Sequence, residues 1–209
     1  MFNILVDLLP KTVTVGSVEY PINTDFRTSI LFEQVAADPD IKSEDKWKYL
    51  LEYYYEGITI TNENVEGLVE EALKFYMCDK RELTSEKEIS EEETGPYHNE
   101  KIYDFDYDDT YIYTAFLQQY GIDLQDVEYL HWWKFKAMFN SLKEDCKFCK
   151  ILEYRSADLS KIKDEEQRKH YKTMKELYKL PTKKNIAEEK KQKEITDCLM
   201  AGLDPSHLL

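Results

Sequence analysis

The sequence predicts a mainly α-helical protein, a compact helical domain of about six to seven helices with a small N-terminal β-hairpin and a mobile acidic linker. Apolar residues recur at helical spacing through most of the chain, whereas strict alternation is confined to one short stretch near the start. Only six glycines and six prolines interrupt the 209 residues, and 16 tyrosines supply aromatic contact area for a core.

The alternating stretch, residues 13–22, reads VTVGSVEYPI. Its valines alternate with polar residues, and a Gly-Ser turn dipeptide divides it into two halves. Pro21 cannot donate a ladder hydrogen bond, so we expect it at a strand end or an edge. This pattern predicts the β-hairpin.

Two helices are expected to follow the hairpin. Thr24 or Asp25 can cap the first, and the Asp-Pro pair at 38–39 ends it. Ser43 has the position and chemistry of a cap for the second, which is expected to run to Gly57.

A third helix is predicted from Asn62 to Tyr76, although Gly67 inside it costs about 1 kcal/mol relative to alanine. The hairpin and these three helices form a predicted segment, 1–78. Residues 79–101 then contain eight acids and four bases with few large apolar groups. Such a composition does not bury enough surface to offset the entropy of ordering, so it predicts an acidic flexible linker.

Residues 103–142 are rich in aromatic side chains and predict a helical hairpin. In the first helix Ile112, Phe116 and Tyr120 lie on one side, and Gly121 is expected in the left-handed conformation that ends it. Asp123 is expected to cap the second helix. The apolar arc of that helix comprises Leu124, Val127, His131, Phe135, Met138 and Leu142.

The opposite face of the second helix is the predicted partner-binding site. A helical projection places Tyr129, Trp133 and Lys136 there. Tyrosine and tryptophan are enriched at protein interfaces because they combine a large apolar body with a polar tip. Packing of this face against another helix of the same chain is the alternative.

The rest of the chain continues the helical pattern. A short helix is expected around residues 148–154, and a basic helix follows Ser160 and ends before Pro181. Segment 102–180, which contains the aromatic hairpin and the basic helix, is expected to pack with 1–78 as one domain. Residues 181–209 are expected to form a weakly ordered C-terminal tail.

The net charge of −14 argues against attraction of the whole protein to nucleic acid or to an anionic membrane. Residues 161–194 nevertheless contain twelve Lys and Arg against seven Asp and Glu. A solvated helix face is the simpler explanation of that basic run. The apolar start MFNILVDLL is too short to span a membrane and has no basic leader region, which predicts a cytoplasmic protein.

No catalytic, cofactor-binding or metal-binding residues are predicted, and we expect a protein that is not an enzyme. Asp104, Asp106 and Asp108 resemble the opening of a calcium loop, but its glycine and distal glutamate are missing, so a helix entrance is favoured. Cys146 and Cys149 have a zinc-compatible spacing without two further ligands, which favours helical packing with reduced thiols. The histidine at 131 is expected to be a hydrogen-bonded core residue.

Three runs of sequence together resemble one known family. These runs are PINTDFRTSILFEQ, YDFDYDDTYIYTAFLQQYGIDL, and YLHWWKFKAMFNSL followed by YRSADLSKIKDEEQRKHY. They are similar to the bacteriophage family named after gene product fifteen, and the likeness extends from about Tyr20 to Leu180. The LHWWKF run is its most specific part.

Members of that family are encoded beside the tape-measure protein of long-tailed phages, a location that implies a tail-assembly chaperone. The resemblance therefore implies a non-enzymatic protein whose partners are the tape-measure protein or other tail proteins, with self-association as a further possibility. The alternatives are a structural tail or connector component, a nucleic-acid-binding accessory protein that uses the basic run at 161–194, and an enzyme that uses a metal at the acidic run.

Overall fold

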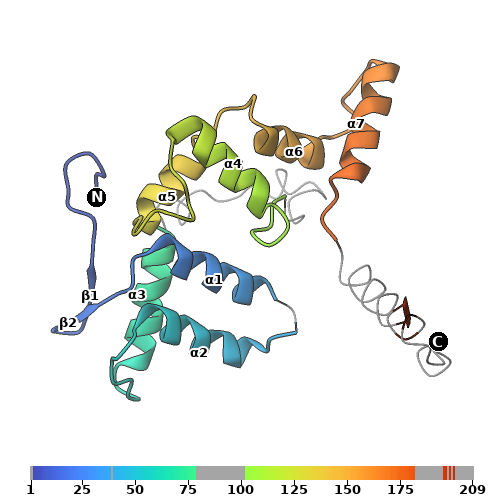
Figure 1. Cartoon of the computed structure of the whole chain (residues 1–209). Coiled ribbons are helices and arrows are strands. Elements are labelled where there is room, and N and C mark those ends of the chain that lie inside the picture. Colours follow the sequence, from blue (N-terminus) through green and yellow to red (C-terminus); the bar gives the residue numbers. More distant parts are fainter. Residues whose placement is uncertain are drawn as a thin grey trace. The chain divides into compact units, whose positions relative to one another are not determined.

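The computed structural model describes residues 2–38, 40–78 and 102–181, together with residues 195, 196, 198 and 200 (Figure 1). The described part is mainly α-helical, with seven helices and a two-stranded antiparallel hairpin, which confirms the predicted fold class. The predicted acidic linker lies outside the described residues, as does most of the predicted tail.

The chain divides into two compact units. The first comprises Met1–Lys101 and Asp108–Cys149, and the second comprises Ile102–Tyr107 and Lys150–Leu209. The domain boundaries expected from the sequence stay a prediction.

The hairpin lies near the N-terminus of the first unit. Strand β1 (Thr12–Val15) pairs with β2 (Val18–Pro21), and Val13 lies opposite Tyr20 in the register. Gly16, in the turn between the strands, has a φ of 63°, a conformation that glycine adopts without steric penalty. The predicted hairpin is thus confirmed, with the proline at the end of β2.

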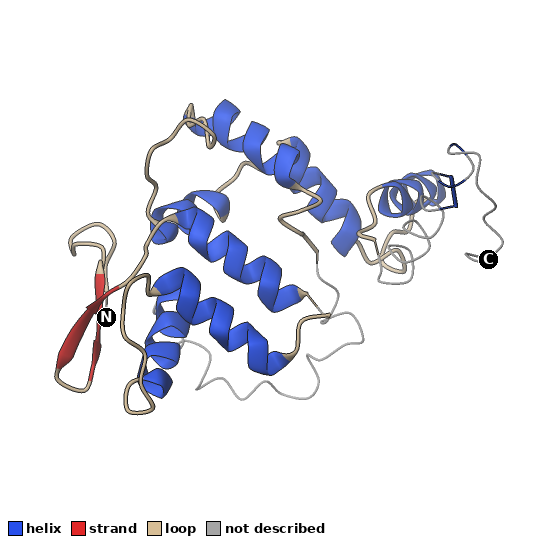
Figure 2. Ribbon diagram, turned by 60° about the horizontal axis from the view of Figure 1, so that its bottom comes forward, coloured by secondary structure: helices blue, strands red, loops and turns tan. Residues whose placement is uncertain are grey.

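Three helices follow: α1 (Phe26–Ala37), α2 (Ser43–Tyr54) and α3 (Val65–Tyr76). Helix α2 packs against both α1 and α3, and Figure 2 shows α1 and α2 side by side. The carboxylate of Asp25 accepts a hydrogen bond from the backbone N–H of Arg27, so Asp25 caps α1 as one of the two predicted candidates. The cap predicted for α2 was wrong, because Ser43 is the first helical residue and Lys42 occupies the cap position.

Polar bonds inside this core fix the spacing of the helices. The Ser29 hydroxyl and the Tyr54 hydroxyl are 2.7 Å apart, and both side chains are fully buried. The Tyr55 hydroxyl donates to the carbonyl oxygen of Leu68 at 2.7 Å. Burial raises the pKa of Tyr54 and Tyr55, so both phenols stay protonated and able to donate.

Gly67 of α3 lies against Val15 of strand β1. A Cβ atom at this position would lie 2.4 Å from Cγ1 of Val15, closer than real Cβ contacts allow. The helix interior therefore tolerates the glycine because β1 packs directly on it.

Helix α4 (Asp109–Tyr120) ends at Gly121, whose φ of 65° confirms the predicted left-handed cap. The extent predicted for the second helix of the aromatic hairpin was wrong. Helix α5 comprises only Trp132–Phe139, and residues 121–131 form no helix. Its cap is His131 and not Asp123.

The irregular segment before α5 is held by bonds to the start of α1. Arg27 donates from Nη2 to the carbonyl oxygens of Leu124 at 2.9 Å and Val127 at 2.8 Å. Backbone bonds join Phe26 N–H to the Leu130 carbonyl and Trp132 N–H to the Thr24 carbonyl. These hydrogen bonds satisfy backbone carbonyl groups of the segment, which would otherwise need the hydrogen bonds of a continued helix.

The phenylalanine at 135 occupies the centre of the core formed by α1, α4 and α5. Its ring stacks at a centroid distance of 4.9 Å on both Phe26 and Phe116. All three side chains are buried.

Helix α6 comprises Lys147–Ser156, and its residues from Lys150 onward belong to the second unit. Helix α7 (Glu165–Leu177) follows it. The Tyr154 ring contacts the rings of Tyr171 and Tyr178, at centroid distances of 5.5 and 6.2 Å. The Tyr171 and Tyr178 rings therefore pack against Tyr154 and are not presented as free stacking surfaces. Within the described ranges, no helix has the length and apolarity that a bilayer crossing needs.

Candidate functional site

The site that the sequence predicts lies around the start of α5. Tyr129 is half exposed, as predicted, but it belongs to the irregular segment and not to a helix. Its hydroxyl lies 2.6 Å from the Oγ1 atom of Thr24, which fixes the ring at the surface. Tyr129 therefore offers an ordered aromatic face to solvent, and its role in partner binding stays a prediction.

The expectation that Trp133 points outward was wrong. Trp133 is buried, with an exposed fraction of 7%. Its Nε1–H donates to the carbonyl oxygen of Phe75 at 2.7 Å, and the ring stacks on the Phe75 ring. The Phe2 ring meets it edge-on at a centroid distance of 4.6 Å. The projection failed because α5 starts only at Trp132, so Tyr129 and Trp133 do not share a helical face.

Lys136 is half buried along α5. Its Nζ atom lies 5.2 Å from the Trp132 ring centroid and 5.8 Å from that of Phe139. A cation over aromatic faces is held by their negative quadrupole. This lysine therefore packs on the core aromatics of its own helix, and its predicted contact with a partner stays a prediction.

His131 is a buried, hydrogen-bonded core residue, as predicted, with an exposed fraction of 2%. Its Nδ1 atom accepts a hydrogen bond from the backbone N–H of Trp133 at 3.1 Å, which caps α5. The other ring nitrogen, Nε2, therefore carries the proton and donates to the Pro10 carbonyl oxygen at 3.0 Å. Burial, and secondarily the charges of Lys134 and Lys11, lower the pKa of His131, whereas the Pro10 bond opposes that shift.

Pro10, which accepts this hydrogen bond, ends an exposed apolar segment that was not predicted as a functional site. We call residues 2–10 the N-terminal arm. Leu5, Val6 and Leu8 in this arm are 90%, 79% and 95% exposed. The sequence signal for this arm is the apolar run MFNILVDLL before the first strand, which is not one side of an amphipathic pattern. This run was interpreted from the sequence only as a leader or a membrane span.

The arm is ordered by its own backbone. The N–H groups of Val6 and Asp7 donate to the Asn3 carbonyl oxygen at 3.0 and 2.8 Å, which closes one turn. The Asn3 side chain accepts from the Leu5 N–H, and the Asp7 carboxylate accepts from the Asn3 N–H at 2.7 Å. The polar groups of this turn bond to one another, while Leu5 and Val6 within it and Leu8 directly after it face solvent.

The aspartates considered as metal ligands belong to different units. Asp104 and Asp106 lie in the second unit, where the Asp104 carboxylate accepts a hydrogen bond from the Asp106 N–H at 2.8 Å. Asp108 lies in the first unit, fully buried at the cap position of α4. Among the described residues, no three His, Cys, Asp or Glu side chains are grouped in a way that could hold a metal ion.

The two cysteines near α6 pack locally. The Cys149 N–H donates to the Cys146 sulfur at 3.4 Å, and the Cys149 thiol donates to the Leu142 carbonyl oxygen. Both thiols are free. Burial, followed by the hydrogen bond with Cys146, raises the pKa of Cys149 to about 12, which keeps it a thiol and not a thiolate ligand.

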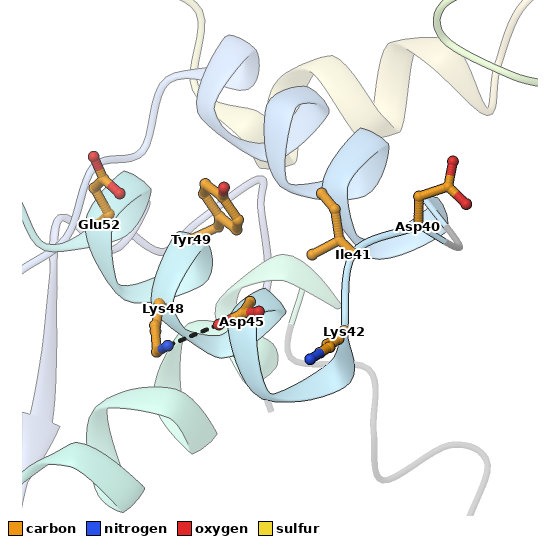
Figure 3. A pocket seen from close by; sticks show the side chains of 7 residues that line it. All are labelled: Asp40, Ile41, Lys42, Asp45, Lys48, Tyr49 and Glu52. Carbon is orange, nitrogen blue, oxygen red and sulfur yellow. Dashed lines mark hydrogen bonds and ion pairs between the residues drawn. The ribbon is translucent and has the colours of Figure 1, made fainter.

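A depression of about 470 Å³ lies where α1 leads into α2 (Figure 3). Three acids, two lysines, one isoleucine and one tyrosine line it, and Lys48 bonds to Asp45 at 2.7 Å. The lining residues are Asp40, Ile41, Lys42, Asp45, Lys48, Tyr49 and Glu52. Its mixed charges match no single class of ligand.

Comparison with known proteins gives one result. A family model described as "Bacteriophage Gp15 protein" matches residues 5–180. No curated protein and no solved structure matches the chain. The matched range contains most of the N-terminal arm, the aromatic segment and α7.

Proposed function

Because the chain belongs to the Bacteriophage Gp15 protein family, and is therefore a phage structural or assembly protein, we propose that it is a tail-assembly chaperone without enzymatic activity. Its client in this proposal is the phage tape-measure protein, which it binds before or during tail polymerisation. A tape-measure protein is a long helical client with apolar surface that must stay soluble until the tail forms around it.

The N-terminal arm is the observation that carries this proposal. Single exposed apolar residues are normal on a soluble protein, but three largely exposed aliphatic side chains within four consecutive positions, in and directly after an ordered turn, are not. Burial of each such side chain against a client is worth about 1.5–3 kcal/mol. The summed free energy of burying the three side chains is of the same order as the lower estimates of the free-energy cost of association. The arm is therefore a substantial part of a binding site, and a stable complex needs additional contacts.

Co-expression of the full chain with the tape-measure protein of the same phage or prophage tests the proposal. The expected result is that the tape-measure protein becomes soluble and co-purifies with the chain. A tape-measure protein that stays insoluble, with no complex under native conditions, would contradict it. The comparison needs the tape-measure protein expressed alone as the control.

Mass spectrometry of mature virions separates the chaperone from the alternative, a structural tail or connector component. A chaperone is present in infected cells and absent from purified virions. Recovery of the chain from virions in a fixed ratio to other tail proteins would favour the structural alternative.

A further inference from the structure

The N-terminal arm is fixed to the first unit at both of its ends. At the start, the Phe2 ring lies edge-on against Trp133 at 4.6 Å. At the end, the Pro10 carbonyl accepts the hydrogen bond from His131 at 3.0 Å. The turn between these two contacts is therefore anchored by two buried side chains, Trp133 of α5 and His131 at its cap. The anchoring gives the exposed residues of the arm a defined position.

The base of the arm carries two positive charges. Lys11 directly follows Pro10, and Lys134 lies in the first turn of α5; both side chains are exposed and both charges reach the His131 ring. The acid of the arm, Asp7, bonds back to the Asn3 N–H. In a chain of net charge −14, two cations thus lie near the His131 ring, to which the end of the arm is bonded, and Asp7 is the one acid within the arm.

This combination defines the chemistry of the occupant. An apolar surface is needed to cover Leu5, Val6 and Leu8, and carboxylates at its border are needed to match the two lysines. A helix meets both requirements in one element, because residues three and four apart form an apolar stripe with polar residues along its edges.

We propose that the N-terminal arm, with Lys11 and Lys134 at its base, is the docking site for an amphipathic protein helix whose apolar stripe is bordered by Asp and Glu. The inference rests on the proposed function in that a helix of a phage tail protein is the expected partner. It goes further because it assigns the contact residues on this chain and the charge of the partner helix.

Two synthetic helical peptides test the proposal with the full chain. Both carry the same leucine stripe, and the polar positions are glutamate in one and lysine in the other. Fluorescence anisotropy of labelled peptides is expected to show binding of the glutamate peptide at least about ten times tighter than that of the lysine peptide. Equal binding of both peptides, or binding of neither, overturns the proposal.

Variants of the chain identify the contact. Leu5→Ser/Leu8→Ser is expected to weaken binding of the glutamate peptide at least about tenfold, and Lys11→Glu/Lys134→Glu is expected to reverse the preference between the peptides. The controls are Leu31→Ser/Leu117→Ser, at leucines that are 46% and 41% exposed, and Lys42→Glu/Lys143→Glu, at exposed lysines; both are expected to leave binding unchanged. Control variants that act like the arm variants overturn the assignment.

Circular dichroism and thermal unfolding of each variant verify the fold. Leu5 and Leu8 are at least 90% exposed, so their replacement leaves no cavity. Vesicles that contain anionic lipid are the competing ligand. If the chain binds them through Leu5 and Leu8 and binds the peptides weakly or not at all, the arm is a membrane contact and the proposal is wrong.

Failure of this inference and failure of the proposed function are separable. A soluble tape-measure complex that survives Leu5→Ser/Leu8→Ser supports the function and overturns the docking site. Peptide binding through the arm without any tape-measure complex supports the docking site and overturns the function.

Discussion

The Nε2 atom of His131 lies 3.0 Å from the carbonyl oxygen of Pro10, a residue 121 positions earlier in the sequence. The same imidazole accepts the N–H of Trp133 at Nδ1. One neutral histidine thus joins the N-terminal arm to the start of α5, and it does so only in the tautomer that carries the proton on Nε2.

This relationship predicts a pH dependence of stability. The pKa of His131 is lowered in the folded chain from 6.5, chiefly by burial, so the unfolded chain binds a proton more readily. The contribution of His131 to the free energy of unfolding is therefore complete above the unfolded pKa of 6.5. It is lost as the pH falls below that value through the folded pKa.

Denaturant unfolding at several pH values measures this effect. His131→Asn retains a side chain that can cap α5 but removes the titrating group. Wild type is expected to lose stability relative to this variant as the pH falls below 6.5. Parallel pH profiles of the two proteins would show that His131 does not carry the effect.

Replacement of Trp133 by alanine is expected to destabilise the fold. The side chain is buried and donates a hydrogen bond to Phe75, so the loss in unfolding free energy should be about 3–5 kcal/mol. Tyr129→Phe removes only the bond to Thr24 and should lose about 0.5–1.5 kcal/mol. If chemical denaturation shows similar, small losses for both, Trp133 is a surface residue and the packing described above is wrong.

Gly67→Ala is expected to destabilise the chain, although alanine is favoured over glycine inside helices by roughly 0.5–1 kcal/mol. The added methyl group would lie 2.4 Å from Cγ1 of Val15, and such overpacking typically costs about 1–3 kcal/mol.

Val15→Ala in the same chain removes the atom that clashes. In a double-mutant cycle followed by urea unfolding, Gly67→Ala should therefore be less harmful in the Val15→Ala background than in wild type. Additive losses would mean that α3 and β1 are not in contact at this position.

Cys149 is expected to resist alkylation. With a pKa raised to about 12, it has very little thiolate near pH 8. Treatment of the native chain with iodoacetamide, followed by mass spectrometry, should leave this cysteine unmodified until denaturant is added. Labelling of the native chain at the rate of the unfolded one would contradict the raised pKa of this thiol.

Local signals in the sequence predict much of the fold. The turn glycine in the β-hairpin, the Asp25 cap and the left-handed Gly121 each depend on residues within a few positions, so they can be recognised without the tertiary structure. The same holds for α7, which lies between Ser160 and Pro181 as its own stretch of sequence predicts.

The segment from Asp123 to His131 shows where local signals fail. Its apolar spacing fits a helix, but Arg27, almost 100 residues earlier, bonds to the carbonyls of Leu124 and Val127, and the Phe26 N–H bonds to that of Leu130. These distant partners are not visible in the sequence of the segment. The error moved the start of α5 and with it the predicted orientation of Trp133.

The candidate site was predicted only in part. The exposure of Tyr129 was confirmed. The arm was not recognised as a site because its apolar run shows neither helical nor alternating periodicity. The ring contact of Phe2 and the hydrogen bond to Pro10 show that the run is held in place, and Leu5, Val6 and Leu8 are exposed to solvent.

In the proposed complex, the chain holds a tail protein through its N-terminal arm. The most direct test is the dissociation constant of the complex between the full chain and the tape-measure protein, measured for wild type and for Leu5→Ser/Leu8→Ser. The predicted result is a stable complex with wild type and binding at least about ten times weaker with the variant. The absence of a complex with wild type would contradict the proposed function, and equal affinities would contradict the role of the arm.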